Sequence, residues 1–234
     1  MKKPYQRLAG RAIEDILGRG RVPFLVGGSP LYVRAVVDGL AIPPVPPNEE
    51  LRRQLEQEAA AGGAAALHEE LRALDAEAAA RIQPTNVRRV IRAIEVIRSS
   101  GTKFSDLQRV EPPRYRTLLI ALTMPREELF RRVDERVEEM LKAGWVAEVR
   151  SLLARGYSPE LPSMSSHGYR AIVSYLLGQM DLPSAVQSIK WDVHRYIRHQ
   201  YTWFRRDRRI HWVDVAVPGY RETVDALVRG WLGG

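Results

Sequence analysis

VPFLVGGSP, residues 22–30, is the stretch of sequence that decides the fold class. Its first five residues are short and apolar, which is typical of a strand buried on both faces of a parallel sheet. The glycines then make a loop, and the apolar spacing that begins at Leu31 predicts a helix. An amphipathic pattern over residues 5–19 that stops at Gly18 predicts a helix before the strand. Residues 5–40 are therefore predicted to form a helix–strand–loop–helix unit of a parallel α/β sheet.

Proline-rich segments divide the rest of the chain. PPVPP at residues 43–47 interrupts regular structure, because proline fixes φ and has no backbone donor. Residues 48–100 then have a helical pattern, whose last part carries an apolar stripe. Strand composition returns at residues 117–122, after Pro112 and Pro113. We predict a core in two parts, residues 1–43 and 113–234, with a helical insertion at residues 44–112.

The second part of the core is predicted to be mainly helical. Residues 126–154 have the pattern of one long helix or a helix pair, with Gly144 as the break. Further helices are expected at about residues 168–177 and 183–204. Residues 209–215 alternate like a last strand before a short final helix.

Composition excludes several classes of function. The chain has no cysteine, and its five histidines form no helical pair, so no metal-binding residue is assigned. No apolar run is long enough for a membrane span or a secretory signal, which predicts a soluble, cytoplasmic protein without a membrane partner. The net charge of +8, mostly arginine, favours a phosphate-rich partner, although arginine-rich sequences are also typical of GC-rich genomes.

Gly27-Gly28-Ser29 is the first candidate site. Glycines between a strand and a helix let the backbone approach a ligand closely, and the N-terminus of a helix attracts anions. The same tripeptide is also typical of an ordinary tight turn.

Arginines on the insertion form the second candidate. Arg88, Arg89 and Arg92 lie opposite an apolar helical stripe and are predicted to form one exposed basic ridge that contacts phosphate, with Arg52, Arg53 and Arg98 as extensions. The alternative is a solvated surface without a ligand.

The third candidate is the helix over residues 183–204. One edge carries cationic and polar side chains that suit a diphosphate, namely His194, Arg195, Arg198, His199 and Thr202. The alternative is a core helix whose arginines pair with neighbouring acids. Asp134, Glu138 and His167 are the candidate general bases, and no pattern singles out one of them.

Four segments in this order resemble the tRNA dimethylallyltransferase family. The family's GGTxxY segment is matched by GGSPLY at residues 27–32, and its RIHPxD motif by RIQPTN at residues 81–86, with a basic helix after it. Its GY(R/K) segment is matched at residues 168–170. Its RYAKRQxTWFR signature is matched by RYIRHQYTWFR at residues 195–205. The resemblance spans essentially the whole chain.

The resemblance implies an α/β fold with a P-loop-type parallel sheet core and a helical insertion domain that grips the tRNA anticodon stem-loop. The adenine next to the anticodon is then flipped out, and its exocyclic amine attacks dimethylallyl diphosphate, with magnesium as cofactor. It implies catalytic roles for Ser29, which matches a family position that touches the tRNA, and for Arg195. Substrate-binding roles follow for Gly27, Gly28, Arg34, Arg52, Arg88, Arg89, Arg92, Arg198, His199 and Thr202.

Departures from the family pattern set further expectations. The family's glycine-rich phosphate loop and the segment with its general-base aspartate do not occur here, so we expect an N-terminally incomplete core with that aspartate upstream of Met1. The 234 residues alone are then expected to be inactive and to aggregate through an unpaired apolar strand at residues 22–26. A complete protein is expected to be monomeric.

Three substitutions also depart from the motifs: Ser29 for threonine, Gln83 for histidine and His199 for arginine. The last of these is expected to lower the affinity for diphosphate. Two alternatives stay open, an adenylate isopentenyltransferase acting on a free nucleotide and a tRNA-binding remnant without catalytic activity. The basic insertion argues against the first.

Overall fold

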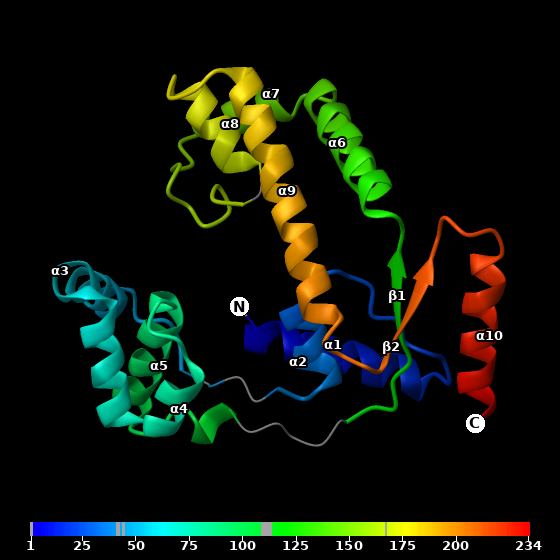
Figure 1. Cartoon of the computed structure of the whole chain (residues 1–234), viewed down its shortest axis with the longest axis horizontal. Coiled ribbons are helices and arrows are strands. Elements are labelled where there is room, and N and C mark those ends of the chain that lie inside the picture. The colour runs from blue at the N-terminus through cyan, green and yellow to red at the C-terminus, as the bar shows by residue number, and fades with distance from the viewer. Residues whose placement is uncertain (1, 41–42, 44, 109–113, 167) are drawn as a thin grey trace. The chain divides into compact units, whose positions relative to one another are not determined.

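The computed structural model describes residues 2–40, 43, 45–108, 114–166 and 168–234, which divide into two compact units, residues 1–117 and residues 118–234 (Figure 1). Each unit has its own helices and its own buried residues. Pro44, Pro112, Pro113 and His167, to which the sequence pattern gave roles, lie outside the described residues.

The first unit is helical. Its elements are α1 Lys2–Gly18, α2 Pro30–Val37, α3 Glu49–Leu74, α4 Ala76–Arg81, α5 Val87–Ser100 and the 3-10 turn η1 Asp106–Gln108. Helix α1 packs on α2, where the rings of Tyr5 and Tyr32 lie 4.5 Å apart and Gln6 donates to the Ala35 carbonyl at 2.5 Å. The helices predicted on either side of the VPFLV segment are therefore confirmed.

The strand predicted at residues 22–26 is wrong. The segment has no regular structure, and Phe24 and Val26 are 78% and 90% exposed. A strand is stable only when a neighbour accepts and donates its backbone hydrogen bonds, and no described residue pairs with this segment. The predicted exposure of an apolar segment is nevertheless confirmed, and aggregation through it stays a prediction.

Helices α3, α4 and α5 share one apolar core. The residues buried in it come from all three helices and from the turn that follows α5, and they include Leu55, Leu71, Val90, Ile94, Val96 and Phe104. Every one of them lies within residues 44–112, as a separately folding insertion requires. The bounds of that insertion stay a prediction.

Asp75 joins the helices of this core. Its buried carboxylate accepts from the backbone N–H of Ala78 at 3.0 Å, which caps α4, and from the backbone N–H of Ser105 at 2.8 Å. Burial alone would raise the pKa of Asp75, but the hydrogen bonds from Ser105 and Ala78 hold that pKa below its ordinary value. The folded state therefore prefers the ionised form.

The second unit contains the sheet. Strands β1 Leu119–Thr123 and β2 Ile210–Asp214 pair in parallel, with Leu119 opposite Ile210 and Thr123 opposite Asp214. The helices of this unit are α6 Arg126–Lys142, α7 Trp145–Ala154, α8 Tyr169–Leu176, α9 Leu182–Phe204 and α10 Tyr220–Gly233. Both strands and the break at Gly144 (φ 102°) agree with the sequence pattern. Strand β1 is only partly covered, because Leu122 is 62% exposed.

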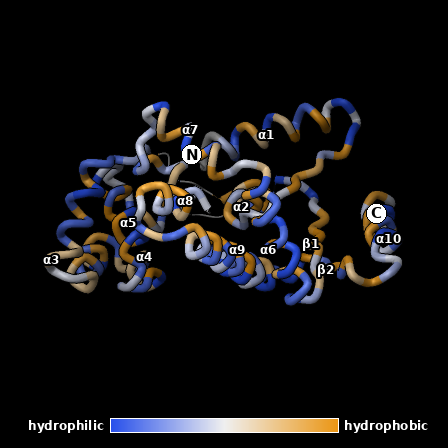
Figure 2. Tube along the Cα trace, turned by 90° about the horizontal axis from the view of Figure 1, so that it is seen from above, coloured by the Kyte–Doolittle hydropathy of each residue, from blue (hydrophilic) through white to orange (hydrophobic). Residues whose placement is uncertain are grey.

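Amphipathic helices build the core of the second unit. In Figure 2 polar and apolar residues alternate along α6 and α9, as helices with one buried face require. Their apolar faces meet those of α7 and α8, where Val137, Val149, Ile172 and Ile189 are buried. The chain thus has the α/β composition that the sequence predicts, with a small parallel sheet and mostly helices.

We expect Gly168→Ala to destabilise the second unit. Gly168 has φ +88°, and an added Cβ would overlap the buried ring of Trp145. Gly178→Ala is the matched control, since φ there is +72° and no atom lies within 4 Å of the added Cβ. Backbone strain costs both variants about 1–2 kcal/mol, and overpacking adds about 1–3 kcal/mol at Gly168 only. Equal unfolding free energies in urea for the two variants would contradict this packing.

We expect the first unit to lose stability in acid. Because the folded state lowers the pKa of Asp75, its contribution is complete above the pKa of the unfolded chain, about 4. The contribution disappears as the pH falls through the lower folded pKa. The unfolding midpoint, followed by circular dichroism between about pH 6 and pH 3, should fall less steeply for Asp75→Asn than for the parent. Parallel curves would exclude Asp75 as a source of acid sensitivity.

Candidate functional site

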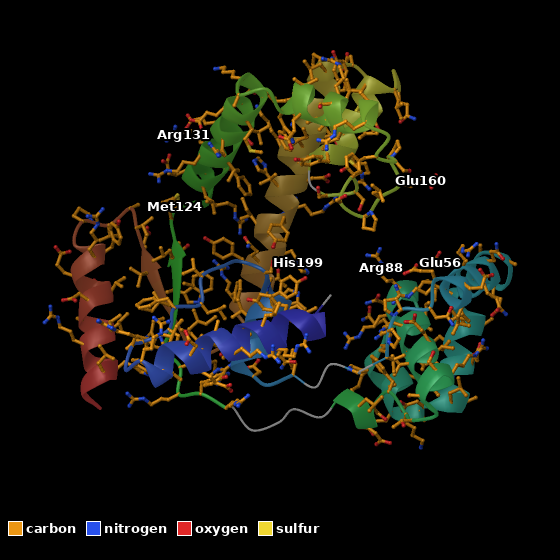
Figure 3. All side chains as sticks on the ribbon, turned by 180° about the vertical axis from the view of Figure 1, so that it is seen from behind. Glu56, Arg88, Met124, Arg131, Glu160 and His199 are labelled. Carbon is orange, nitrogen blue, oxygen red and sulfur yellow. The ribbon has the colours of Figure 1, made fainter. Side chains whose placement is uncertain are left out.

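Helix α9 exposes one basic edge. Arg195, Arg198, His199 and Thr202 fall on one side of the helix within two turns and are all exposed, Arg195 by 69% of its side chain. The opposite face buries Ile189 and Ile197, so packing fixes which side of the helix meets solvent. His199, labelled in Figure 3, lies toward the C-terminal end of this edge. The structure therefore confirms that these four predicted residues share one edge.

His194 does not belong to this edge, contrary to the sequence prediction. Its Nε2 lies 2.8 Å from Asp134 Oδ1 of α6, and its ring stacks on Phe130 at 4.0 Å. One turn earlier, Lys190 pairs with Glu138 at 2.7 Å and lowers the pKa of that carboxyl. Asp134 and Glu138, two of the candidate bases, thus hold α9 against α6.

The C-terminal half of α9 is fixed to the sheet. The Tyr201 hydroxyl lies 2.6 Å from the hydroxyl of Thr123 in β1, and the Tyr201 ring stacks on Trp212 of β2 at 5.4 Å. Contacts on both halves therefore keep the helix, and with it the basic edge, in a set orientation within the second unit.

Arg195 is exposed but not unpaired. It forms an ion pair with Asp192, and Arg170 lies 3.8 Å from the same carboxylate. Two guanidinium groups thus share one acid, which leaves a local excess of positive charge. Arg198 has no ion-pair partner among the residues that the structure describes. The edge therefore suits an anion with several oxygens.

His199 is bound by a neighbour on the same helix. Its Nε2 accepts a hydrogen bond from the indole N–H of Trp203 at 3.0 Å. Thr202 donates its hydroxyl to the Arg198 carbonyl at 2.9 Å and so points back along the helix.

A hollow of about 180 Å³ lies at the start of α2. It is lined by Tyr5, Leu25, Val26, Gly27, Gly28, Ser29, Tyr32 and Val33. Ser29 is the N-cap residue, but its hydroxyl does not cap the helix, and no carboxylate is among the described lining residues. Three predicted positions, Gly27, Gly28 and Ser29, therefore lie together. Arg34 does not line this hollow and pairs with Asp38 at 2.7 Å.

The basic ridge predicted on α5 is only partly formed. Arg88 and Arg89 are exposed and have no ion-pair partner in the described part of the chain, and Figure 3 labels Arg88 on this surface. Arg92, in contrast, is half-buried against Glu95 and donates to the Val45 carbonyl at 2.9 Å. The prediction of one continuous exposed ridge is wrong, because a buried acid turns Arg92 inward.

The arginines expected to extend the ridge are paired as well. Arg52 binds Glu95 at 3.0 Å, Arg53 binds Glu50 at 2.5 Å and Arg98 binds Glu70 at 2.8 Å. Sequence reasoning missed Glu95, the acid that binds two of the predicted arginines. A signal was present, since Glu95 is the only acid of α5 and stands between the apolar residues Ile94 and Val96.

No group of three or more acidic, histidine or cysteine side chains that could hold a metal ion occurs among the described residues. In the same part of the chain, no helix has both the length and the apolar character that a membrane crossing needs.

Comparisons with known proteins identify the family. The family model described as "IPP transferase" matches residues 2–207. A tRNA dimethylallyltransferase of Thermomicrobium roseum is 52% identical over 229 residues, which cover 96% of this chain and 70% of that protein. The protein of the same name from a Roseiflexus species is 44% identical, with 97% of this chain and 75% of that protein covered.

Solved structures agree with the sequence relatives. The tRNA isopentenylpyrophosphate transferase of Bacillus halodurans superimposes with a TM-score of 0.67 at 34% identity, covering all of this chain and 74% of that one. A eukaryotic dimethylallyltransferase acting on tRNA gives 0.73 at 23% identity, over 92% of this chain and 56% of that one, and shows the shared fold alone. The chain belongs to the IPP transferase family.

Proposed function

We propose that this chain transfers a dimethylallyl group from dimethylallyl diphosphate to the exocyclic amine of the adenosine next to the anticodon in tRNA. The single observation that carries the proposal is the fixed basic edge of α9, in which Arg195 and Arg198 are exposed and Arg195 shares the acid Asp192 with Arg170. Relatives named tRNA dimethylallyltransferase that are 44–52% identical support the choice of substrates.

The basic edge suits the leaving group of this reaction. A bond forms between the amine nitrogen and the first carbon of the dimethylallyl group, while the bond from that carbon to the diphosphate oxygen breaks. The bonding electrons leave with the diphosphate, and the amine passes one proton to water. The guanidinium groups of Arg195 and Arg198 stabilise the negative charge that develops on the diphosphate oxygens.

The first unit suits the tRNA. Arg88 and Arg89 are exposed guanidinium groups of the kind that bind phosphates of the RNA backbone. The exocyclic amine is stacked inside the anticodon loop, so the adenine must be flipped out before it reacts. We assign the Ser29 hydroxyl, at the hollow before α2, to a contact with the tRNA.

Magnesium remains part of the proposal as a partner of the diphosphate. Magnesium in proteins is held by one or two carboxylates together with substrate phosphates, and the described lining of the Ser29 hollow has no carboxylate. This lining therefore offers magnesium no carboxylate, and no step above depends on the ion.

Transfer of a labelled dimethylallyl group to an anticodon stem-loop RNA is the direct test, carried out with the gene product that contains residues 1–234. Labelled RNA whose product nucleoside carries the group on its exocyclic amine supports the proposal. Tight RNA binding without transfer would favour the tRNA-binding remnant instead. Transfer to free adenosine monophosphate but not to RNA would favour the adenylate enzyme.

Arg195→Ala is expected to lower kcat/KM for dimethylallyl diphosphate by about 100-fold, because developing charge on the leaving group loses a donor. Affinity for the stem-loop should change little. Arg229→Ala is the matched control, since Arg229 is also an exposed arginine in an ion pair, with Asp225. Equal losses of transfer and RNA affinity in Arg195→Ala would show that Arg195 has a structural or RNA-binding role.

Replacing both Arg88 and Arg89 by alanine is expected to weaken stem-loop binding and to reduce the slope of log K against log salt by about one to two, because two phosphate contacts disappear. The control variant replaces Arg72 and Arg81, which are exposed but paired with Glu69 and Glu77. It removes the same charge and should keep the parental slope. An unchanged slope in the Arg88 and Arg89 variant would rule out the contact.

A further inference from the structure

Glu95 is the most deeply buried carboxylate among the described residues of the first unit. Its side chain is fully buried, yet it accepts from the Asn48 backbone N–H at 2.7 Å, from Arg52 at 3.0 Å and from Arg92. Burial alone would raise the pKa of Glu95, but these three hydrogen bonds hold that pKa below its ordinary value. The carboxylate is therefore ionised at neutral pH.

The two arginines outnumber the buried acid. Arg52 and Arg92 carry two positive charges, whereas Glu95 supplies one negative charge. Glu49, the other acid near Arg52, lies 3.6 Å away, and its side chain is 77% exposed, so solvent screens that pair. The cluster thus keeps about one unit of uncompensated positive charge.

Both guanidinium groups still reach the surface. The side chain of Arg52 is 31% exposed and that of Arg92 is 28% exposed. Each guanidinium has five N–H donors, and the contacts to Glu95, Glu49 and the Val45 carbonyl use only some of them. Paired cations that are already held in place lose little side-chain entropy when an anion binds.

We propose that Glu95 is a positioning residue, which fixes Arg52 and Arg92 side by side as a preformed two-guanidinium site for a single backbone phosphate of RNA. The inference rests on the proposed function, because the phosphate belongs to the tRNA substrate. It also gives the inward turn of Arg92 a role, because Glu95 orients the arginine that is missing from the exposed ridge.

A purely structural role for Glu95 predicts different behaviour. The Asn48 N–H and the Val45 carbonyl both precede α3, so the cluster also ties the chain before α3 to α5. If this tie were the whole role, Glu95→Gln would lower the unfolding midpoint. The variant would then keep the parental salt dependence of RNA binding at temperatures where it stays folded.

The test measures binding of an anticodon stem-loop RNA to the whole protein over a series of salt concentrations. In Glu95→Gln, with folding checked by circular dichroism, we expect at least about a tenfold loss of affinity and a slope lower by about one phosphate contact. Parental affinity and slope in the folded variant would overturn the proposal.

A second variant covers the case in which Glu95→Gln does not fold. Replacing Arg52 and Arg92 by lysine keeps the charge that pairs with Glu95 but removes the planar fork, so binding should weaken by a similar factor. Arg72→Lys and Arg81→Lys together form the control and should bind like the parent. A double lysine variant at Arg52 and Arg92 with parental affinity would also overturn the proposal.

The parent protein separates the inference from the proposed function. A parent that fails to bind the stem-loop contradicts the proposed function and, with it, the phosphate site. If the parent binds and prenylates the RNA, and the Glu95→Gln variant and the double lysine variant bind it equally well, only the phosphate site is contradicted.

Discussion

The structure depends on one constraint, namely that an amphipathic helix can bury only one of its faces. Ile189 and Ile197 direct one face of α9 into the second unit, which leaves Arg195 and Arg198 at the surface. Val90 and Ile94 do the same for α5 and leave Arg88 and Arg89 outside. Core packing therefore decides which arginines are exposed and can bind a phosphate. In both helices these arginines lie on the helix itself and not on a loop.

Shared carboxylates add a second level of organisation. Glu95 lies between Arg52 and Arg92, and Asp192 lies between Arg195 and Arg170. In each cluster one acid orients two guanidinium groups without neutralising both. Such clusters combine the low mobility of an ion pair with a remaining positive charge, which suits the two anions in the proposed reaction, the RNA backbone and the diphosphate.

Sequence periodicity predicted most of the fold, because the helices follow their apolar stripes and β1 and β2 follow apolar or alternating segments. It failed at residues 22–26, where composition indicates a strand but pairing needs a neighbour that no local pattern contains. For the site, spacing predicted the α9 edge correctly except for His194. The inward turn of Arg92 was missed, although Glu95, the buried acid that pairs with it, stands three residues later in the same helix.

Arginine modification by phenylglyoxal, read out residue by residue with mass spectrometry, tests the account most directly. Exposed arginines react, and a bound anion protects those that it contacts. We predict that dimethylallyl diphosphate protects Arg195 and Arg198, that the anticodon stem-loop protects Arg88 and Arg89, and that Arg229 of α10 stays reactive throughout. Protection spread evenly over all exposed arginines, or confined to α10, would contradict the claim that these two helix faces bind the substrates.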